Sequence, residues 1–122
     1  MERTHLERVD MEQSIKQQDG IRVITLSGRF DSTAAPLFDS WFAEQDGPEN
    51  SRYLLDLAEV PYITSAGLRS LLKLLKLLEG RGGKLVLCCV ASPVQDLFKM
   101  AGFTSFLTIC ETRTASLDAL AG

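Results

Sequence analysis

Cysteine and histidine are scarce in this chain of 122 residues, which contains three cysteines and one histidine. Cys88, Cys89 and Cys110 are odd in number and lack a C-x-x-C spacing, and His5 stands alone near the start. Such a set predicts neither a disulfide framework nor a metal-ligand cluster. Because Cys88 and Cys89 lie inside an apolar run, we interpret the cysteines as reduced thiols. The sequence alone therefore predicts no metal and no cofactor.

Positive charge and long apolar runs are also in short supply. Thirteen Lys and Arg residues against sixteen Asp and Glu residues give a net charge of -3. Nucleic acids attract proteins mainly through Lys and Arg on phosphates, so no direct nucleic-acid partner is expected. No apolar run reaches the roughly 18 residues of a membrane span, and residues 1–10 lack the apolar segment of a signal peptide. We expect a cytoplasmic protein without membrane insertion.

The remaining composition is typical of a globular domain, with 45% hydrophobic and 24% charged residues. Residues 1–10 are polar and show no period, which indicates a flexible leader, and residues 11–122 are expected to form one domain. Residues 11–16 and 21–27 are strand-like runs, and the Asp19-Gly20 pair between them favours a hairpin. Helical spacing covers residues 34–45, with Asp31 or Ser32 as the cap, and residues 52–57 form a buried strand.

A long amphipathic helix is predicted to begin at Ser65 and to end in the glycine-rich residues 80–83. Its apolar positions are Leu68, Leu71, Leu72, Leu75 and Leu78, and Arg69, Lys73 and Lys76 form the opposite face. A buried strand is expected over residues 84–90. Next comes a short helix with Ser92 as its cap, Pro93 in its first turn, Gly102 at its end and an inward face of Val94, Leu97, Phe98 and Ala101.

A last strand over residues 106–110 and a last helix over residues 114–120 complete the predicted order β-β-α-β-α-β-α-β-α. This order predicts an α/β fold with about five strands and about four helices. The strand, helix and strand from residue 52 to residue 90 form a right-handed unit with parallel strands.

The stretch Thr64-Ser65-Ala66-Gly67 stands where folds of this kind place their sites, between a parallel strand and the next helix. Free N–H groups and the helix dipole favour an anion there, and a phosphoserine carries roughly -1.5 to -2 charges at neutral pH. A plain helix cap is the alternative, since Ser and Thr are common caps. Thr64 can cap through its own hydroxyl, and this would leave Ser65 without a capping duty.

Residues 60–69, Val-Pro-Tyr-Ile-Thr-Ser-Ala-Gly-Leu-Arg, resemble the signature turn of STAS domains, the family of bacterial anti-sigma factor antagonists. Residues 28–31 are similar to the family's Gly-x-Leu-Asp turn, residues 55–57 to its central strand, and residues 94–103 to its third helix. The resemblance covers about residues 11–120. It implies a STAS-like mixed β-sheet in a protein that is not an enzyme.

The resemblance also implies a function in partner switching. The serine at the position of Ser65 is phosphorylated in this family by a partner that is both a serine kinase and an anti-sigma factor. The unmodified domain binds this partner, the phosphorylated domain releases it, and a serine phosphatase resets the cycle. The expected phosphorylation site is Ser65, with Thr64 as the second candidate. The expected partner-binding residues are Asp31, Thr64, Ser65, Ala66, Gly67, Leu68 and Arg69.

Two departures from the family pattern accompany this resemblance. Many relatives have Asp where this chain has Thr64, and the second serine common in such turns is Ala66 here. Thr64 therefore removes an acidic contact and adds a second hydroxyl.

Three other functions remain open at this point. A receiver-type phosphoacceptor would use Asp56, but residues 21–27 offer no acidic pair for magnesium. A small enzyme would use the hydroxyls of Thr64, Ser65 and Ser70, but no histidine or lysine base is placed beside them. A STAS domain that acts without a kinase, as an assembly subunit of a lipid transporter or signalling complex, is the third. Arg69, four residues after Ser65, is a candidate phosphate partner or a solvated charge.

Overall fold

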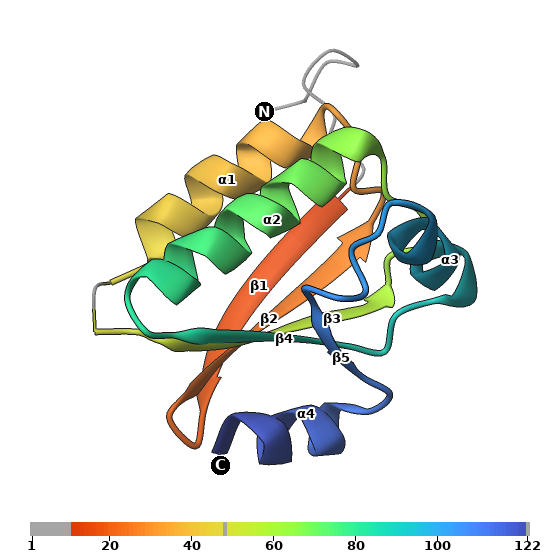
Figure 1. Cartoon of the computed structure of the whole chain (residues 1–122). Coiled ribbons are helices and arrows are strands. Elements are labelled where there is room, and N and C mark those ends of the chain that lie inside the picture. Colours follow the sequence, from red (N-terminus) through yellow and green to blue (C-terminus); the bar gives the residue numbers. More distant parts are fainter. Residues whose placement is uncertain (1–10, 48, 122) are drawn as a thin grey trace.

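The computed structural model describes residues 11–47 and 49–121 and confirms the predicted order of elements (Figure 1). The predicted flexible leader, residues 1–10, lies outside the described residues. The elements are β1 (Met11–Gln18), β2 (Ile21–Gly28), α1 (Ala34–Gln45), β3 (Arg52–Glu59), α2 (Ser65–Gly80), β4 (Lys84–Cys88), α3 (Ser92–Met100), β5 (Thr108–Cys110) and α4 (Arg113–Ala121). None of the helices in this described part is both long enough and apolar enough to cross a membrane.

The five strands form one mixed sheet in the order β1-β2-β3-β4-β5. β1 and β2 are antiparallel, whereas the pairs β2–β3, β3–β4 and β4–β5 are parallel. The turn of the β1–β2 hairpin is formed by Asp19 and Gly20, whose φ angles are 54° and 79°. Two successive positive φ angles are the geometry that an Asp-Gly pair favours in a tight hairpin, so the predicted hairpin is confirmed.

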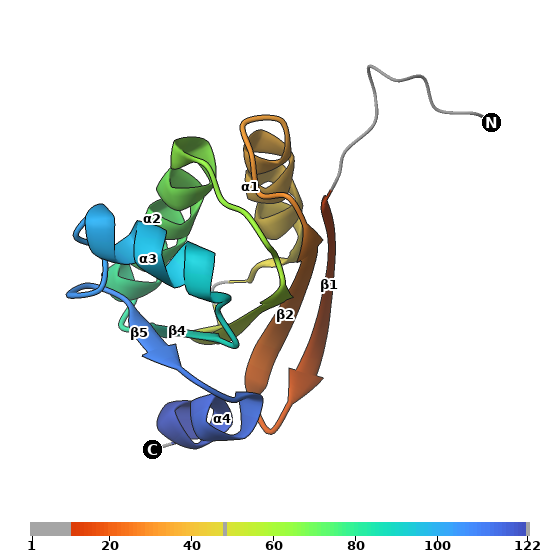
Figure 2. The same ribbon diagram turned by 90° about the vertical axis from the view of Figure 1, so that its right-hand side faces the viewer.

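Helices cover both faces of the sheet, and among the described helices α4 is the one on its face (Figures 1 and 2). The central strand β3 is buried on both faces. Its Tyr53, Leu55 and Leu57 join the large apolar cluster under α1, α2 and α3, and Leu54 joins a smaller cluster beneath α4. Alternate residues of a strand point to opposite faces, so one continuous apolar run serves two layers.

The amphipathic pattern of α2 is confirmed, with one shift in its buried face. Arg69, Lys73 and Lys76 are exposed, as predicted, but Leu74 is buried and Leu72 is only partly buried. α2 packs against both α1 and the sheet, so its buried face is wider than the face formed by the predicted leucines alone and includes Leu74.

Two predictions about α3 were wrong. Ala91 holds the cap position and makes no side-chain cap bond, so Ser92 is the first helical residue. Ala101 is exposed, although Val94 and Phe98 are buried as predicted. The N–H groups of Val94 and Gln95 both donate to the Ala91 carbonyl, and Gly102 ends the segment with a φ of 76°. The backbone alone therefore closes the first turn, without a hydroxyl.

Two strands are shorter than predicted. β4 ends at Cys88 because Cys89 takes a φ of 60°, which breaks the extended chain. β5 begins at Thr108, and Phe106 is 61% exposed in the preceding turn, where its N–H donates to the Phe103 carbonyl. The apolar character of residues 106 and 107 had suggested a longer strand.

Candidate functional site

The loops that follow β2 and β3 are joined to each other beside the start of α2. Phe30 and Ile63 form an isolated parallel bridge. The Phe30 N–H donates to the Tyr62 carbonyl at 3.0 Å, and the Thr64 N–H donates to the Phe30 carbonyl at 3.0 Å. This pairing extends the β2–β3 contact past the strand ends and brings the loop that contains Asp31 next to the Thr64-Ser65 turn.

Gly67 lets the first turn of α2 approach this bridge closely. A β-carbon at this position would lie 2.5 Å from the Phe30 carbonyl oxygen and 3.0 Å from Cγ2 of Ile63. Contacts below 3.0 Å require the backbone to move, so the turn needs a residue without a side chain here. Leu68 is 6% exposed and packs into the core beside it. The close backbone contact at Gly67 and the buried side chain of Leu68 therefore fix the position of the turn against the core.

Thr64 is the cap of α2, as its hydroxyl had suggested. Its φ and ψ angles are −93° and 176°, and its Oγ1 accepts a hydrogen bond of 3.4 Å from the Gly67 N–H. The same hydroxyl donates to the Phe30 carbonyl at 3.4 Å. The half-buried Thr64 side chain is thus engaged with the backbone on both sides of the turn.

Ser65 is the first residue of α2 and is exposed. Its hydroxyl makes no hydrogen bond to any part of residues 11–47 or 49–121 in this structure. Ser70, the third hydroxyl considered for an enzyme, is buried and donates to the Ala35 carbonyl at 3.4 Å. Of these three hydroxyls, only that of Ser65 is on an exposed residue and makes no hydrogen bond within the described residues.

Asp31 is half-buried and closes the turn before α1. Its Oδ1 accepts hydrogen bonds from the N–H groups of Thr33 at 3.1 Å and Ala34 at 3.0 Å. The cap position of α1 is Thr33, which makes no side-chain cap bond, so the predicted cap at Asp31 or Ser32 was wrong in position. The Asp31 carboxylate nevertheless satisfies two N–H groups at the helix start. Asp31 still follows Phe30 directly, so it stands in the loop joined to the Ser65 turn.

A small cleft of about 320 Å³ separates the first turns of α1 and α2. It is lined by Ser32, Ala35, Pro36, Asp39, Ala66, Arg69, Ser70 and Lys73. The predicted residues Ala66 and Arg69 therefore lie together on a recessed surface beside Ser65. An ion pair between Lys73 and Asp39, 3.0 Å long, joins the two helices across this cleft.

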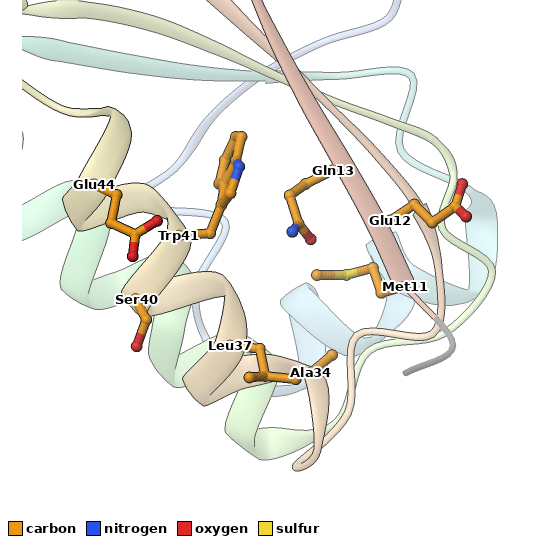
Figure 3. A pocket seen from close by; sticks show the side chains of 8 residues that line it. All are labelled: Met11, Glu12, Gln13, Ala34, Leu37, Ser40, Trp41 and Glu44. Carbon is orange, nitrogen blue, oxygen red and sulfur yellow. The ribbon is translucent and has the colours of Figure 1, made fainter. Parts of the chain in front are cut away.

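A larger groove between β1 and α1 contains none of the predicted site residues. Met11, Gln13 and Trp41 face one another across it, with Ser40 and Glu44 on the helix side (Figure 3). The groove borders the other side of α1 from the cleft beside Ser65, so the two hollows are separate surfaces.

Asp56, the residue on which a receiver-type function would depend, is 7% exposed beneath α4. Its Oδ1 accepts from the Ala58 N–H at 2.9 Å, and its Oδ2 accepts from Arg113 Nη2 at 2.7 Å and Nε at 3.2 Å. A carboxylate that is covered and paired in this way is a poor phosphate acceptor. The role of Arg113 was not visible in the sequence, since 57 residues separate the two partners.

Comparisons with known proteins agree on one family. The STAS domain model matches residues 12–115. BtrV of Bordetella bronchiseptica, described as a putative anti-sigma factor antagonist, is 33% identical over 109 residues, which are 89% of this chain and 94% of the relative. The crystal structure of a putative anti-sigma factor antagonist from Thermotoga maritima superposes with a TM-score of 0.86 at 18% identity, covering 90% of this chain and 95% of the other.

Structures of SpoIIAA in its unphosphorylated and phosphorylated forms have the same fold as this chain. The anti-sigma factor antagonist SpoIIAA in its unphosphorylated form has a TM-score of 0.75 at 17% identity, over 91% of this chain and 97% of its own. The phosphorylated form of SpoIIAA from Bacillus has a TM-score of 0.68 at 15% identity, over 88% and 98%. With the family model spanning most of its residues, this chain belongs to the STAS domain family.

Proposed function

We propose that this protein is an anti-sigma factor antagonist in a partner-switching pathway, a cytoplasmic binding protein and not an enzyme. In its unphosphorylated form it binds an anti-sigma factor that is also a serine kinase. Phosphorylation of Ser65 by that partner releases the complex, and a serine phosphatase restores binding. The relatives' descriptions as anti-sigma factor antagonists support the partner class, and the existence of SpoIIAA in phosphorylated form supports the modification.

The division of roles between Thr64 and Ser65 carries this proposal. Thr64 caps α2, whereas the Ser65 hydroxyl is exposed and unengaged within the described residues. A kinase can therefore modify Ser65 without first breaking a cap or unfolding the helix. Thr64 is the poorer acceptor, because its hydroxyl already bonds to the Gly67 N–H and the Phe30 carbonyl.

The physical effect of phosphorylation at Ser65 is a local change of charge on a preformed surface. A phosphate at the start of α2 lies at the positive end of the helix dipole, so the fold tolerates it. A docked partner must instead accommodate roughly -1.5 to -2 additional charges in a contact made for a neutral hydroxyl. Desolvation of such a charge without a matching cation costs several kcal/mol, which is enough to release a partner.

The test combines modification and binding. Site-resolved mass spectrometry of the protein from its own cells, growing and stressed, should find phosphate on Ser65 at a level that differs between the two states. In a binding titration with a serine kinase of the anti-sigma class from the same cells, Ser65→Ala should bind like the wild type. Ser65→Asp should bind about tenfold more weakly or worse, a change of about 1.4 kcal/mol.

Ser92→Asp is the matched control for this experiment. Ser92 is likewise an exposed first residue of its helix, α3, so its replacement adds the same charge at an equivalent helix position. It should leave binding unchanged. Equal binding by Ser65→Ala and Ser65→Asp, together with unmodified Ser65 and Thr64 in cells, would contradict the switch and favour the kinase-independent assembly subunit.

A further inference from the structure

A row of four polar or sulfur-bearing side chains crosses the sheet beneath α4. Thr25 on β2 is paired in register with Asp56 on β3, Asp56 with Cys88 on β4, and Cys88 with Cys110 on β5. Residues paired in neighbouring parallel strands point to the same face. Cys88 belongs to the apolar cluster of this face, so the row lies between the sheet and α4, the face opposite α1 and α2 (Figure 2).

Cys89 adds a second thiol to this row. Adjacent residues of a regular strand point to opposite faces, but the φ of 60° at Cys89 turns the chain. As a result, Cys89 Sγ lies 3.5 Å from Cys88 Sγ. A carboxylate oxygen of Asp56 and the two sulfurs all lie within 4.8 Å of one another. The cysteines are all free.

We propose that Cys88, Cys89 and Asp56 form a binding site for one thiophilic divalent cation of the zinc class. Zinc binds thiolate sulfur at about 2.3 Å and carboxylate oxygen at about 2.0–2.2 Å. Two sulfurs 3.5 Å apart can therefore share one ion, which would sit between them on the side of the carboxylate. Mixed sulfur and oxygen donors suit zinc better than magnesium or calcium, which prefer oxygen alone.

The charges of the site balance when the ion is bound. A cysteine binds zinc as its thiolate, so both sulfurs must be free of their protons when they ligate the ion. Binding breaks two S–H bonds, forms two sulfur–metal bonds and releases two protons to solvent, without any change of oxidation state. Two thiolates, the Asp56 carboxylate, the Arg113 guanidinium and a divalent ion then sum to zero charge.

Arg113 is compatible with the ion as a positioning residue. Of the two Asp56 carboxylate oxygens, Arg113 hydrogen-bonds to Oδ2 and not to Oδ1. Its Nη2 also donates to Thr25 Oγ1 at 3.2 Å. Each carboxylate oxygen has two lone pairs, so Asp56 retains acceptor capacity beyond Arg113 and the Ala58 N–H. Hydrogen-bonded carboxylates are usual around protein metal sites, where the outer contacts fix the ligand's orientation.

The site is reachable from solvent. Cys88 is fully buried, but Cys89 and Arg113 are partly exposed. Of the three proposed ligands, Cys89 is the most exposed, so an ion would approach from its side. Because β3 and β4 would both hold the ion and α4 is attached to Asp56 through Arg113, binding should stabilise this face of the domain against unfolding.

The experiment uses the full chain, freshly reduced and freed of metal, with zinc and cobalt as the probes. Calorimetric titration with zinc chloride should give one ion per chain and raise the thermal unfolding midpoint. Cobalt should produce the intense thiolate-to-metal absorption that an oxygen-only site lacks. Cys89→Ser should lower zinc affinity by about tenfold or more and weaken that absorption.

Two variants serve as matched controls. Cys110→Ser removes a thiol of the same row that is not in the proposed ligand set, and His5→Gln removes the only histidine of the chain. Both should bind like the wild type. The apo form of Cys89→Ser should unfold at the wild-type midpoint, since its side chain is only partly buried.

Three results would overturn the site: no cobalt–thiolate absorption in the reduced wild type, an undiminished zinc affinity in Cys89→Ser, or an equal loss in Cys110→Ser. These outcomes are independent of the Ser65 switch, which lies at the start of α2 on the other face of the sheet.

Discussion

Gly67 lies directly against the backbone of Phe30, so closely that a β-carbon on Gly67 would stand 2.5 Å from the Phe30 carbonyl oxygen. The start of α2 can therefore pack closely against the loop after β2 only because residue 67 has no side chain. Gly67→Ala should destabilise the protein by about 1–3 kcal/mol, because a methyl group must displace backbone that cannot yield easily. Equilibrium unfolding in urea measures this loss.

Gly80→Ala is the control for that substitution. Gly80 is the last residue of the same helix, and a β-carbon there would meet nothing within 4 Å. Alanine at this position should be neutral or stabilise by up to about 1 kcal/mol, since alanine favours helix. The steric account of Gly67 fails if the two alanine variants have the same unfolding midpoint.

The cap of α2 can be tested separately from the switch residue. Thr64→Val removes the hydroxyl but keeps the branched shape, so it should lower the free energy of unfolding by about 1 kcal/mol. Thr64→Ser should retain most of the stability because it keeps the oxygen that accepts from the Gly67 N–H. If the valine and serine variants are equally stable, the bonds of 3.4 Å at this hydroxyl contribute nothing.

Local patterns along the chain predicted most of the fold and the turn that presents Ser65. The Asp19-Gly20 hairpin, the leucine spacing of α2 and the glycine after α3 each depend on a few adjacent residues, and each was confirmed. One kind of error arose where the backbone supplied what a side chain was expected to supply. Ser92 was such a case, because the Ala91 carbonyl closes the first turn of α3 without it.

The sequence could not predict which side chains the register of the parallel strands places next to one another. Thr25, Asp56, Cys88 and Arg113 come from four separate elements, and only strand pairing and the return of α4 place them side by side. Cysteine spacing had argued against a metal site, since C-x-x-C was absent. The adjacent thiols of Cys88 and Cys89 meet only because of the positive φ at Cys89.

Asp46 forms a charged anchor at the end of α1 that should make stability depend on pH. Arg81 Nη2 lies 2.7 Å from Asp46 Oδ1, and the Tyr53 hydroxyl donates to the same oxygen. Desolvation pushes the pKa of Asp46 upward, but hydrogen bonds from Arg81 and Tyr53 outweigh it and hold the pKa below its ordinary value of 3.8. The ionised form is therefore stabilised by folding.

Asp46→Asn should lower the free energy of unfolding by about 2 kcal/mol at pH 7, as hydrogen bonds to a charged group are lost. The difference from the wild type should shrink as the pH falls below 3.8 and through the lower pKa of the folded state, because the wild-type carboxyl then becomes neutral as well. Urea unfolding of both proteins at a series of pH values measures this. A difference that stays constant down to strongly acidic pH would exclude the ionic contribution.

The ion pair between Arg113 and Asp56 should account for the attachment of α4 to the sheet. The two side chains are 32% and 10% exposed, so the pair is only partly shielded from water. Arg113→Met leaves a covered carboxylate without its cation and should cost on the order of 2 kcal/mol, below the roughly 3–5 kcal/mol of a fully buried pair. The first sign should be faster amide hydrogen exchange in α4.

A double-mutant cycle separates the pair from the packing of Arg113. Asp56→Asn combined with Arg113→Met removes both charges and should recover most of the stability that the single methionine variant loses, because no unpaired charge remains. Arg69→Met, at an exposed arginine of α2, is the matched control and should change stability by less than about 0.5 kcal/mol. Strictly additive losses in the double variant would mean that α4 is held by its apolar contacts under Leu117 and Leu120 and not by the charge pair.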